Sequence, residues 1–185
     1  MAKRVLVAIA DGIEEIEAVC IIDTLRRGGA EVTVASVDSL QVTASRGVKL
    51  VADKLIADCA GETFDLIVLP GGMPGAEHLR DCGALAEMLK AQKAAGRMYG
   101  AICASPAVVL GHHGLLGDKR ATCHPALRDK LVCAKKSDDR VVADGTCVTS
   151  RGPGTAIEFA LELVGQLFGD ERMRQVAEPM LAAGY

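Results

Sequence analysis

Short runs of apolar, often β-branched residues alternate along this chain with longer segments whose composition suits helices. The apolar runs have strand length and cover residues 3–9, 31–37, 65–70 and 97–103. The helical segments cover residues 12–29, 85–96, 154–169 and about 170–178. Continuous apolar strands suit a sheet covered on both faces, and strands alternating with helices favour parallel pairing. We therefore expect an α/β protein with a doubly wound, mostly parallel sheet sandwiched by helices.

Glycines mark where several of these elements should end. Gly28 and Gly29 are C-cap candidates for the first helix, and Gly96 is one for the second. The Asp144-Gly145 pair is typical of a hairpin turn. A hairpin, one further strand and two short helices are expected at residues 140–150, 119–123, 106–114 and 125–131. Because no repeat or linker-like change in composition interrupts the pattern, the whole chain is expected to form one domain.

Composition narrows the class of protein. Half of the 185 residues are hydrophobic and 24% are charged, as in an ordinary globular chain. With 3% aromatic residues, no Trp and a formal charge of -3, the chain lacks the basic stripe and stacking platforms of nucleic-acid-binding proteins. No run approaches the ~20 apolar residues of a membrane span, and the first apolar run meets Asp11 before reaching the length of a signal segment. Seven cysteines without a C-x-x-C pair indicate reduced thiols and a cytosolic protein.

Three loops should meet at one edge of the predicted sheet. In open parallel sheets, ligands bind beyond the carboxyl ends of the strands. The loops that follow the first, third and fourth strands lie at residues 11–12, 70–72 and 101–105. The chemistry of the protein is therefore to be sought among these three loops.

Cys103, in the stretch GAICASP, stands among small residues where the fourth apolar run ends. A free cysteine in an arbitrary place is most often a buried small hydrophobe. On a sharp strand-to-helix turn it would instead present its sulfur above the sheet, and Ala101, Ala104 and Ser105 are small enough for such a turn. The N–H groups and partial positive charge of the following helix would then stabilise a thiolate. On this hypothesis Cys103 is an acidic, reactive nucleophile.

A nucleophile that attacks a carbonyl also needs hydrogen-bond donors for the developing oxyanion. Glycine tolerates the backbone angles and close approach that such a donor needs, so the loop of Gly71 and Gly72 can supply one N–H. Ala104, directly after Cys103, would supply the second. A Gly-Gly pair most often only makes a turn, and this pair gains weight from its expected place beside Cys103.

Glu17 is the candidate for proton transfer. Its helical neighbours include Ile13, Cys20 and Ile21, so it lies on a largely apolar stripe. A carboxyl buried there would have a raised pKa, which a general acid or base at neutral pH uses. The alternative is a solvated glutamate that complements the helix dipole, and this alternative suits Glu14 and Glu15 better than Glu17.

Histidines offer weaker signals. His124 precedes Pro125 where a short helix should begin, and such a histidine is more often a cap or surface residue than a catalytic base. His112 and His113 are adjacent, so on a helix their side chains point about 100° apart, and no further ligands have metal-site spacing. We expect no metal, and we interpret Cys123 and the other thiols as structural.

Taken in order, these features resemble the DJ-1/ThiJ/PfpI superfamily, and most closely its DJ-1 branch. The likeness covers nearly the whole chain, and its specific segments are EEIE (14–17), LPGGMPGAEHL (69–79), AICASPAVVL (101–110), CHPALRDK (123–130) and TSRGPGTAIEFAL (149–161). The resemblance implies a flavodoxin-like fold and a homodimer. It also implies that Cys103 is the elbow cysteine, Glu17 its hydrogen-bonding glutamate and His124 the nearby histidine, with oxyanion N–H groups on Gly72 and Ala104. Positions similar to the family's dimer edge are Arg26, Arg27, Arg46, Gly152 and Pro153.

Members of this family are credited with cofactor-free glyoxalase activity, deglycation of proteins and nucleotides, oxidative-stress sensing and chaperoning, so the resemblance implies one or more of these activities. We expect an enzyme that converts small α-oxoaldehydes such as methylglyoxal and glyoxal, or their glycated adducts, without cofactor. The alternative is a redox sensor and chaperone in which the same cysteine is oxidised to a sulfinate. Ala104 stands where protease-like branches often carry histidine or glycine, which argues against peptidase activity. Ser105 stands where many close relatives have glycine.

Overall fold

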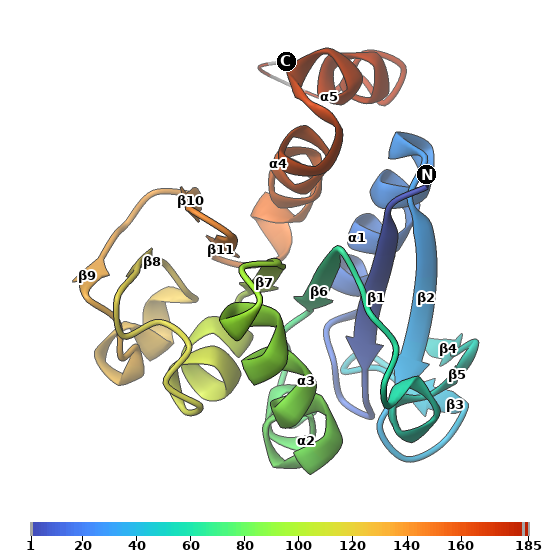
Figure 1. Ribbon diagram of the computed structural model, residues 1–185, viewed down its shortest axis with the longest axis vertical. Helices are drawn as coiled ribbons and strands as arrows, with labels where there is room; N and C mark the ends of the chain where they lie inside the picture. Colours follow the sequence, from blue (N-terminus) through green and yellow to red (C-terminus); the bar gives the residue numbers. More distant parts are fainter. Residues whose placement is uncertain (1, 183, 185) are drawn as a thin grey trace.

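Seven strands form the central sheet of the computed structural model, which describes residues 2–182 and 184 (Figure 1). Their order is β10-β11-β7-β6-β1-β2-β5. All neighbouring strands pair in parallel except β10 and β11, which form an antiparallel hairpin. The strands are β1 (Arg4–Ile9), β2 (Glu31–Ser36), β5 (Lys54–Leu55), β6 (Leu66–Leu69), β7 (Met98–Ile102), β10 (Val141–Asp144) and β11 (Cys147–Ser150).

Helices cover both faces of this sheet (Figure 1). One group consists of α1 (Glu15–Gly28), α4 (Ala156–Phe168) and α5 (Asp170–Ala177), which pack against one another. The other group consists of α2 (Gly75–Asp81), α3 (Gly83–Ala94) and the π-helix η2 (Pro106–Gly111). Strand β1 contacts both α1 and α2, so the two groups lie on opposite faces. The expected doubly wound α/β sheet in one domain is confirmed.

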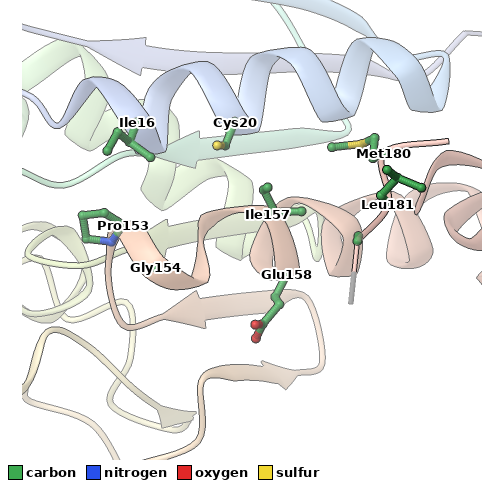
Figure 2. Close-up of a pocket in the computed structure, with 9 residues that line it drawn as sticks. Ile16, Cys20, Pro153, Gly154, Ile157, Glu158, Met180 and Leu181 are labelled. Atoms are coloured by element: carbon green, nitrogen blue, oxygen red, sulfur yellow. The ribbon is translucent and has the colours of Figure 1, made fainter. Parts of the chain in front are cut away.

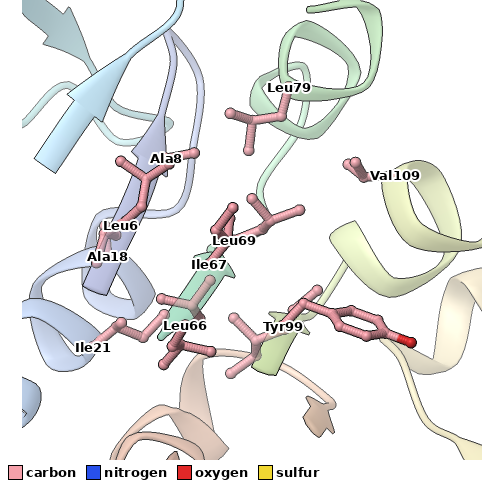
Figure 3. Packing of buried hydrophobic residues seen from close by; sticks show 14 of the residues in the cluster. Leu6, Ala8, Ala18, Ile21, Leu66, Ile67, Leu69, Leu79, Tyr99 and Val109 are labelled. Atoms are coloured by element: carbon pink, nitrogen blue, oxygen red, sulfur yellow. The ribbon is translucent and has the colours of Figure 1, made fainter. Parts of the chain in front are cut away.

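Side chains from both helix groups meet the central strands in the core (Figure 3). Leu6 of β1 and Leu66 of β6 are fully buried, as are Ile21 of α1 and Leu79 of α2. Burying one such side chain contributes about 1.5–3 kcal/mol to folding. Because strands β1 and β6 are covered on both sides, their sequences have to be apolar at consecutive positions, which is the pattern that predicts them.

Short elements at the sheet edges depart from the expectations. The strand expected at 119–123 is only β8 (Arg120–Ala121), which pairs with β9 (Lys135–Lys136) outside the main sheet. The helix expected at 106–114 is the π-helix η2, and that at 125–131 is the 3-10 helix η3 (Pro125–Lys130). Elements without a corresponding expectation are the strands β5 and β9, the hairpin β3 (Gln41–Thr43) and β4 (Lys49–Val51), the helix α2, and the 3-10 turns η1 (Ile56–Cys59) and η4 (Pro153–Thr155).

The helix-ending glycines have distinct roles. Gly29 has φ +96° and caps α1 by donating its N–H to the Arg26 carbonyl. Gly28 is instead the last residue of α1, and a Cβ on it would lie 3.0 Å from a methyl group of Val164 in α4. Gly28 therefore allows α1 and α4 to approach closely. Among the described helices, none combines the length and apolarity needed to cross a membrane.

Candidate active site

Cys103 follows β7 directly and has φ +65°, in the left-handed region that side-chain-bearing residues rarely adopt. Two hydrogen bonds hold this conformation: the Cys103 N–H donates to the Ser150 carbonyl at 3.0 Å, and the His124 N–H donates to the Cys103 carbonyl at 2.8 Å. Strained backbone of this kind concentrates at functional sites. The residue is 9% exposed, so its sulfur sits on a constrained elbow with a narrow opening to solvent.

The loop after β6 is pressed against this elbow. A Cβ on Gly71 would lie 2.6 Å from the Cβ of Cys103 and 2.7 Å from the Ala104 nitrogen. Gly72 has φ +87°, and a Cβ on it would collide with the Glu14 nitrogen. The Glu14 N–H in turn donates to the Gly71 carbonyl at 2.9 Å. These contacts bring together the three loops that the sequence predicts at one edge of the sheet. Because the loop after β6 lies tightly between the other two loops, only glycine fits at positions 71 and 72.

Backbone donors lie beside the sulfur. The N–H groups of Gly72 and Ala104 both act on Cys103 as hydrogen-bond donors and lower its pKa. This is the pair expected to hold an oxyanion. Their position beside Cys103 is a feature of the geometry, and their catalytic role stays a prediction.

Glu17 lies in the first turn of α1 and is fully buried. Its Oε2 accepts a hydrogen bond of 2.7 Å from the Gly71 N–H. Its Oε1 has no hydrogen-bond partner among the residues that the structure describes. Burial raises the pKa of Glu17 to about 7, the hydrogen bond from Gly71 and the neighbouring Cys103 thiol oppose this rise, and the charge of Glu14 adds to it. The carboxyl expected on an apolar stripe is thus buried, with one oxygen free, and it lies beside Cys103.

Burial and an ionised Glu17 oppose the predicted acidic thiol at Cys103. Burial raises the pKa of Cys103 to about 12, the negative charge of Glu17 adds to this rise, and the N–H groups of Gly72 and Ala104 act against it. The helix after the elbow is a six-residue π-helix that begins only at Pro106, so its dipole does not outweigh the lost hydration. While Glu17 is ionised, Cys103 is therefore a thiol, and the predicted nucleophilic role would need a base, for which Glu17 is the candidate.

A cavity of about 420 Å³ opens above the sulfur. Its lining includes Cys103, Gly72, Ala104 and His124. Four of the five predicted site residues therefore share one cavity. Glu17 is not part of the lining and reaches it only through Cys103 and Gly71.

His124 both caps η3 and lines the cavity. Its Nδ1 accepts a hydrogen bond of 3.3 Å from the Ala126 N–H. An imidazole that accepts at Nδ1 carries its proton on Nε2 when neutral. The interpretation of His124 as a helix cap is therefore correct for Nδ1, and Nε2 is left as a hydrogen-bond donor.

Glu15, interpreted as solvated, is only 6% exposed. Its carboxylate accepts hydrogen bonds from the Ser45 hydroxyl at 3.0 Å and the Arg46 N–H at 2.9 Å. Although burial acts to raise the pKa of Glu15, these and other hydrogen bonds hold it below its usual range. Glu15 thereby fixes the turn between β3 and β4, and Ser45 and Arg46 of this turn form one wall of the cavity. The sequence carries no local signal for this contact, because the partners are 30 or more residues apart.

The other predicted dimer-edge residues do not all lie at the cavity, because Arg26 and Arg27 are in the last turn of α1, at the end away from Glu17. Arg26 is 3.9 Å from Asp53, and Arg27 is 2.6 Å from Asp23. Pro153 lines the Cys103 cavity and also a groove between α1 and α4.

The adjacent histidines His112 and His113 lie outside the Cys103 cavity. His113 Nε2 is 2.9 Å from the Arg80 carbonyl oxygen. Within residues 2–182 and 184, no three His, Cys, Asp or Glu side chains gather to hold a metal ion.

Ser105 ties the elbow to the glycine loop. Its hydroxyl, fully buried, donates to the Pro70 carbonyl at 2.5 Å. Ser105→Ala leaves that carbonyl without its donor, so we expect the free energy of unfolding in urea to fall by about 1–3 kcal/mol. The control is Ser39→Ala, because the exposed Ser39 hydroxyl donates to the Gln41 carbonyl at 2.7 Å. Equal losses in both variants would contradict a structural role for the Ser105 contact.

A cysteine at positive φ after a parallel strand, beside a buried glutamate and two backbone donors, defines an α/β protein with a cysteine elbow. The chain belongs to the DJ-1/PfpI family, whose model matches residues 3–166. This confirms the resemblance found in the sequence.

Relatives match nearly the whole chain. Protein DJ-1 homolog B of Arabidopsis thaliana is 50% identical over 181 residues, which are 97% of this chain and 41% of that protein. The chain thus spans less than half the length of this relative. The glutathione-independent glyoxalase DJR-1.2 of Caenorhabditis elegans is 41% identical over 92% of this chain and 91% of its own length. The structure of oxidized Toxoplasma gondii DJ-1 has 52% identity and a TM-score of 0.96, and the match covers 98% of this chain and 100% of that one.

Proposed function

We propose that this protein is a glutathione-independent glyoxalase that converts methylglyoxal to lactate without a cofactor. The observation that carries the proposal is the Cys103 elbow, which has the buried carboxyl of Glu17 and the N–H groups of Gly72 and Ala104 as neighbours. The glyoxalase from Caenorhabditis elegans, 41% identical over nearly its full length, supports the same activity.

The first step is addition of the sulfur to the aldehyde carbon. The Glu17 carboxylate accepts the thiol proton while the carbon–sulfur bond forms, because its pKa of about 7 leaves it partly ionised at neutral pH. The carbonyl oxygen becomes an oxyanion, which the N–H groups of Gly72 and Ala104 stabilise. Glu17 then returns the thiol proton to this oxyanion, which gives the neutral hemithioacetal and restores the Glu17 carboxylate for the next step.

The second step moves a proton between adjacent carbons. Glu17 removes the proton from the carbon that bears sulfur, an enediol forms, and the proton returns to the neighbouring carbon to give a lactoyl thioester. The Nε2–H of His124 donates to a substrate oxygen during this transfer. Water then hydrolyses the thioester, which releases lactate and restores the thiol, so methylglyoxal plus water gives lactate with no net oxidation.

The direct test is to incubate the purified protein with methylglyoxal in the absence of glutathione. We expect one lactate for each methylglyoxal consumed, and loss of aldehyde without lactate would overturn the proposal. Glyoxal and glycated adducts form a second substrate set for the same assay.

A redox sensor and chaperone is the second candidate function. It draws support from the oxidized state of the Toxoplasma gondii relative and from the proximity of Glu17, which as an acid can donate to a sulfinate. Intact mass after mild peroxide treatment separates the two functions. Addition of two oxygens at Cys103 alone, together with no lactate from methylglyoxal, would favour the sensor.

We also propose that a second copy of the chain covers the groove between α1 and α4 (Figure 2). Ile16, Ile157 and Leu181 line this groove and are 53%, 42% and 90% exposed. Large apolar side chains gathered on one exposed face mark interaction surfaces. Since Pro153 lines both the groove and the Cys103 cavity, the second copy would border the active site.

Ile16→Glu places a charge in this groove and is expected to turn a dimer into a monomer in sedimentation equilibrium. Val132→Glu is the control, because Val132 is 64% exposed and lies outside the groove. A wild-type protein that is monomeric, or a dimer that survives Ile16→Glu, would contradict the proposed interface.

A further inference from the structure

A second cavity, of about 300 Å³, adjoins the one above Cys103. Met73 and Leu127 line both cavities, so the two spaces meet at these side chains. Met73 is 47% exposed, and a methionine in that setting can change rotamer at little cost. A molecule attached to Cys103 can therefore extend past Met73 and Leu127 into the second cavity.

The second cavity is built on the helix that follows the elbow. The π-helix η2 contributes Ala107 and Val108, while α2 and η3 form its sides. Val132 completes it, and its backbone is held against η2 because a Cβ on Gly111 would lie only 3.4 Å from the Val132 nitrogen. Helices of the π type are rare and frequently occur at functional sites.

Both apolar and charged side chains line this cavity. Met73, Val108, Leu127 and Val132 supply apolar surface, and Val132 is 64% exposed. The same lining also contains polar and charged side chains, which are Glu77, Arg80, His112 and Lys130, and Arg80 is 2.7 Å from Asp81 outside the lining. Because charges of both signs are present, this lining is not specific for an anion. Its apolar side chains suit an alkyl chain.

We propose that the second cavity binds the alkyl tail of the aldehyde substrate, so that α-oxoaldehydes with unbranched tails are better substrates than methylglyoxal. The proposal rests on the proposed glyoxalase function. The methyl group of methylglyoxal is too short to fill the space beyond Met73 and Leu127. Each buried methylene of a longer tail should raise kcat/KM roughly three- to fourfold until the tail has filled the cavity.

The kinetic test compares methylglyoxal with 2-oxopentanal and 2-oxoheptanal. In the wild type we expect the ratio of kcat/KM for 2-oxoheptanal over methylglyoxal to exceed tenfold. Val132→Asp should reduce this ratio to near one, and Val132→Phe should reduce it by filling the cavity. The matched control is Val51→Asp, because Val51 is 70% exposed and lies outside both cavities, and its ratio should equal that of the wild type.

A second measurement does not depend on turnover. N-alkylmaleimides from methyl to heptyl should alkylate Cys103 faster as the alkyl chain lengthens, and Val132→Asp should remove this trend. The partly exposed Cys82, followed by peptide mass in the same samples, serves as the internal control and should show no trend. Alkylation of Cys103 that ignores chain length in the wild type would overturn the tail site. A clear trend without turnover of any aldehyde would keep the tail site and refute the glyoxalase proposal.

Discussion

Replacing Cys103 with serine is expected to lower kcat/KM for methylglyoxal by at least about 10³-fold, the scale seen when an enzyme loses its nucleophile. Glu17, with a pKa of about 7, can take a proton from a thiol during attack. It cannot do so effectively from a serine hydroxyl, which is far less acidic and less nucleophilic. Lactate formation measured under single-turnover conditions checks this result, because such conditions separate chemistry from product release.

The matched control is Cys59→Ser. Cys59 is a fully buried cysteine outside the site, and its Sγ lies 3.5 Å from the Leu55 carbonyl, so a hydroxyl there has an acceptor. This variant should retain wild-type activity. If Cys103→Ser turned over methylglyoxal at a rate within tenfold of Cys59→Ser, covalent chemistry at the elbow would be refuted.

The parts of the site that lie on regular elements could be predicted from the sequence. Glu17 stands on the apolar stripe of a long helix, and the period of that stripe places it in the core before any tertiary contact is known. Cys103 ends a buried strand among small residues, which favours a tight elbow there. Both signals are local, and in both cases the residue lies where the pattern indicates.

The parts that depend on distant neighbours could not be predicted. The pKa of Cys103 is set by a balance between burial, Glu17 and backbone donors from separate loops, and a helix dipole alone gives the wrong direction. The contact of Glu15 with Ser45 joins helix α1 to a hairpin of three-residue strands, too short to show a period of two. Helix α2 begins at Gly75, pressed against the Ile13 backbone, and glycine is a poor local signal for a helix.

Glu17→Gln is expected to stabilise the protein at pH 8 while removing most of its activity. In the folded protein the pKa of Glu17 is raised from 4.5 to about 7, so between these values the folded state holds a proton that the unfolded state has released. The contribution of Glu17 to the free energy of unfolding is therefore largest below about pH 4.5. It decreases by about 3 kcal/mol in all as the pH rises to about 7. Glutamine does not titrate, and its amide oxygen can still accept from Gly71.

The measurement is urea unfolding of the wild type and Glu17→Gln between pH 4 and pH 8. We expect the variant to gain about 3 kcal/mol relative to the wild type across this interval, whatever its fixed offset. Glu15→Gln is the matched control, and its stability relative to the wild type should change with pH in the opposite direction. Hydrogen bonds lower the pKa of Glu15, so its carboxylate stabilises the fold above its unfolded pKa. A difference between Glu17→Gln and the wild type that does not change with pH would contradict a raised pKa at Glu17.

The same ionisation links stability to catalysis. The Glu17 carboxylate is the form that can accept the thiol proton, so wild-type kcat/KM should rise with pH to a plateau with a midpoint near 7. Glu17→Gln should lose this pH dependence together with about 10²- to 10⁴-fold in kcat/KM, the range typical of a lost general base. The protein would thus become less stable over the pH interval in which it becomes active, because one buried carboxylate with a free oxygen both costs folding energy and supplies the base. An activity profile that is flat from pH 5 to pH 8 would separate the two effects and assign the proton transfer to another group.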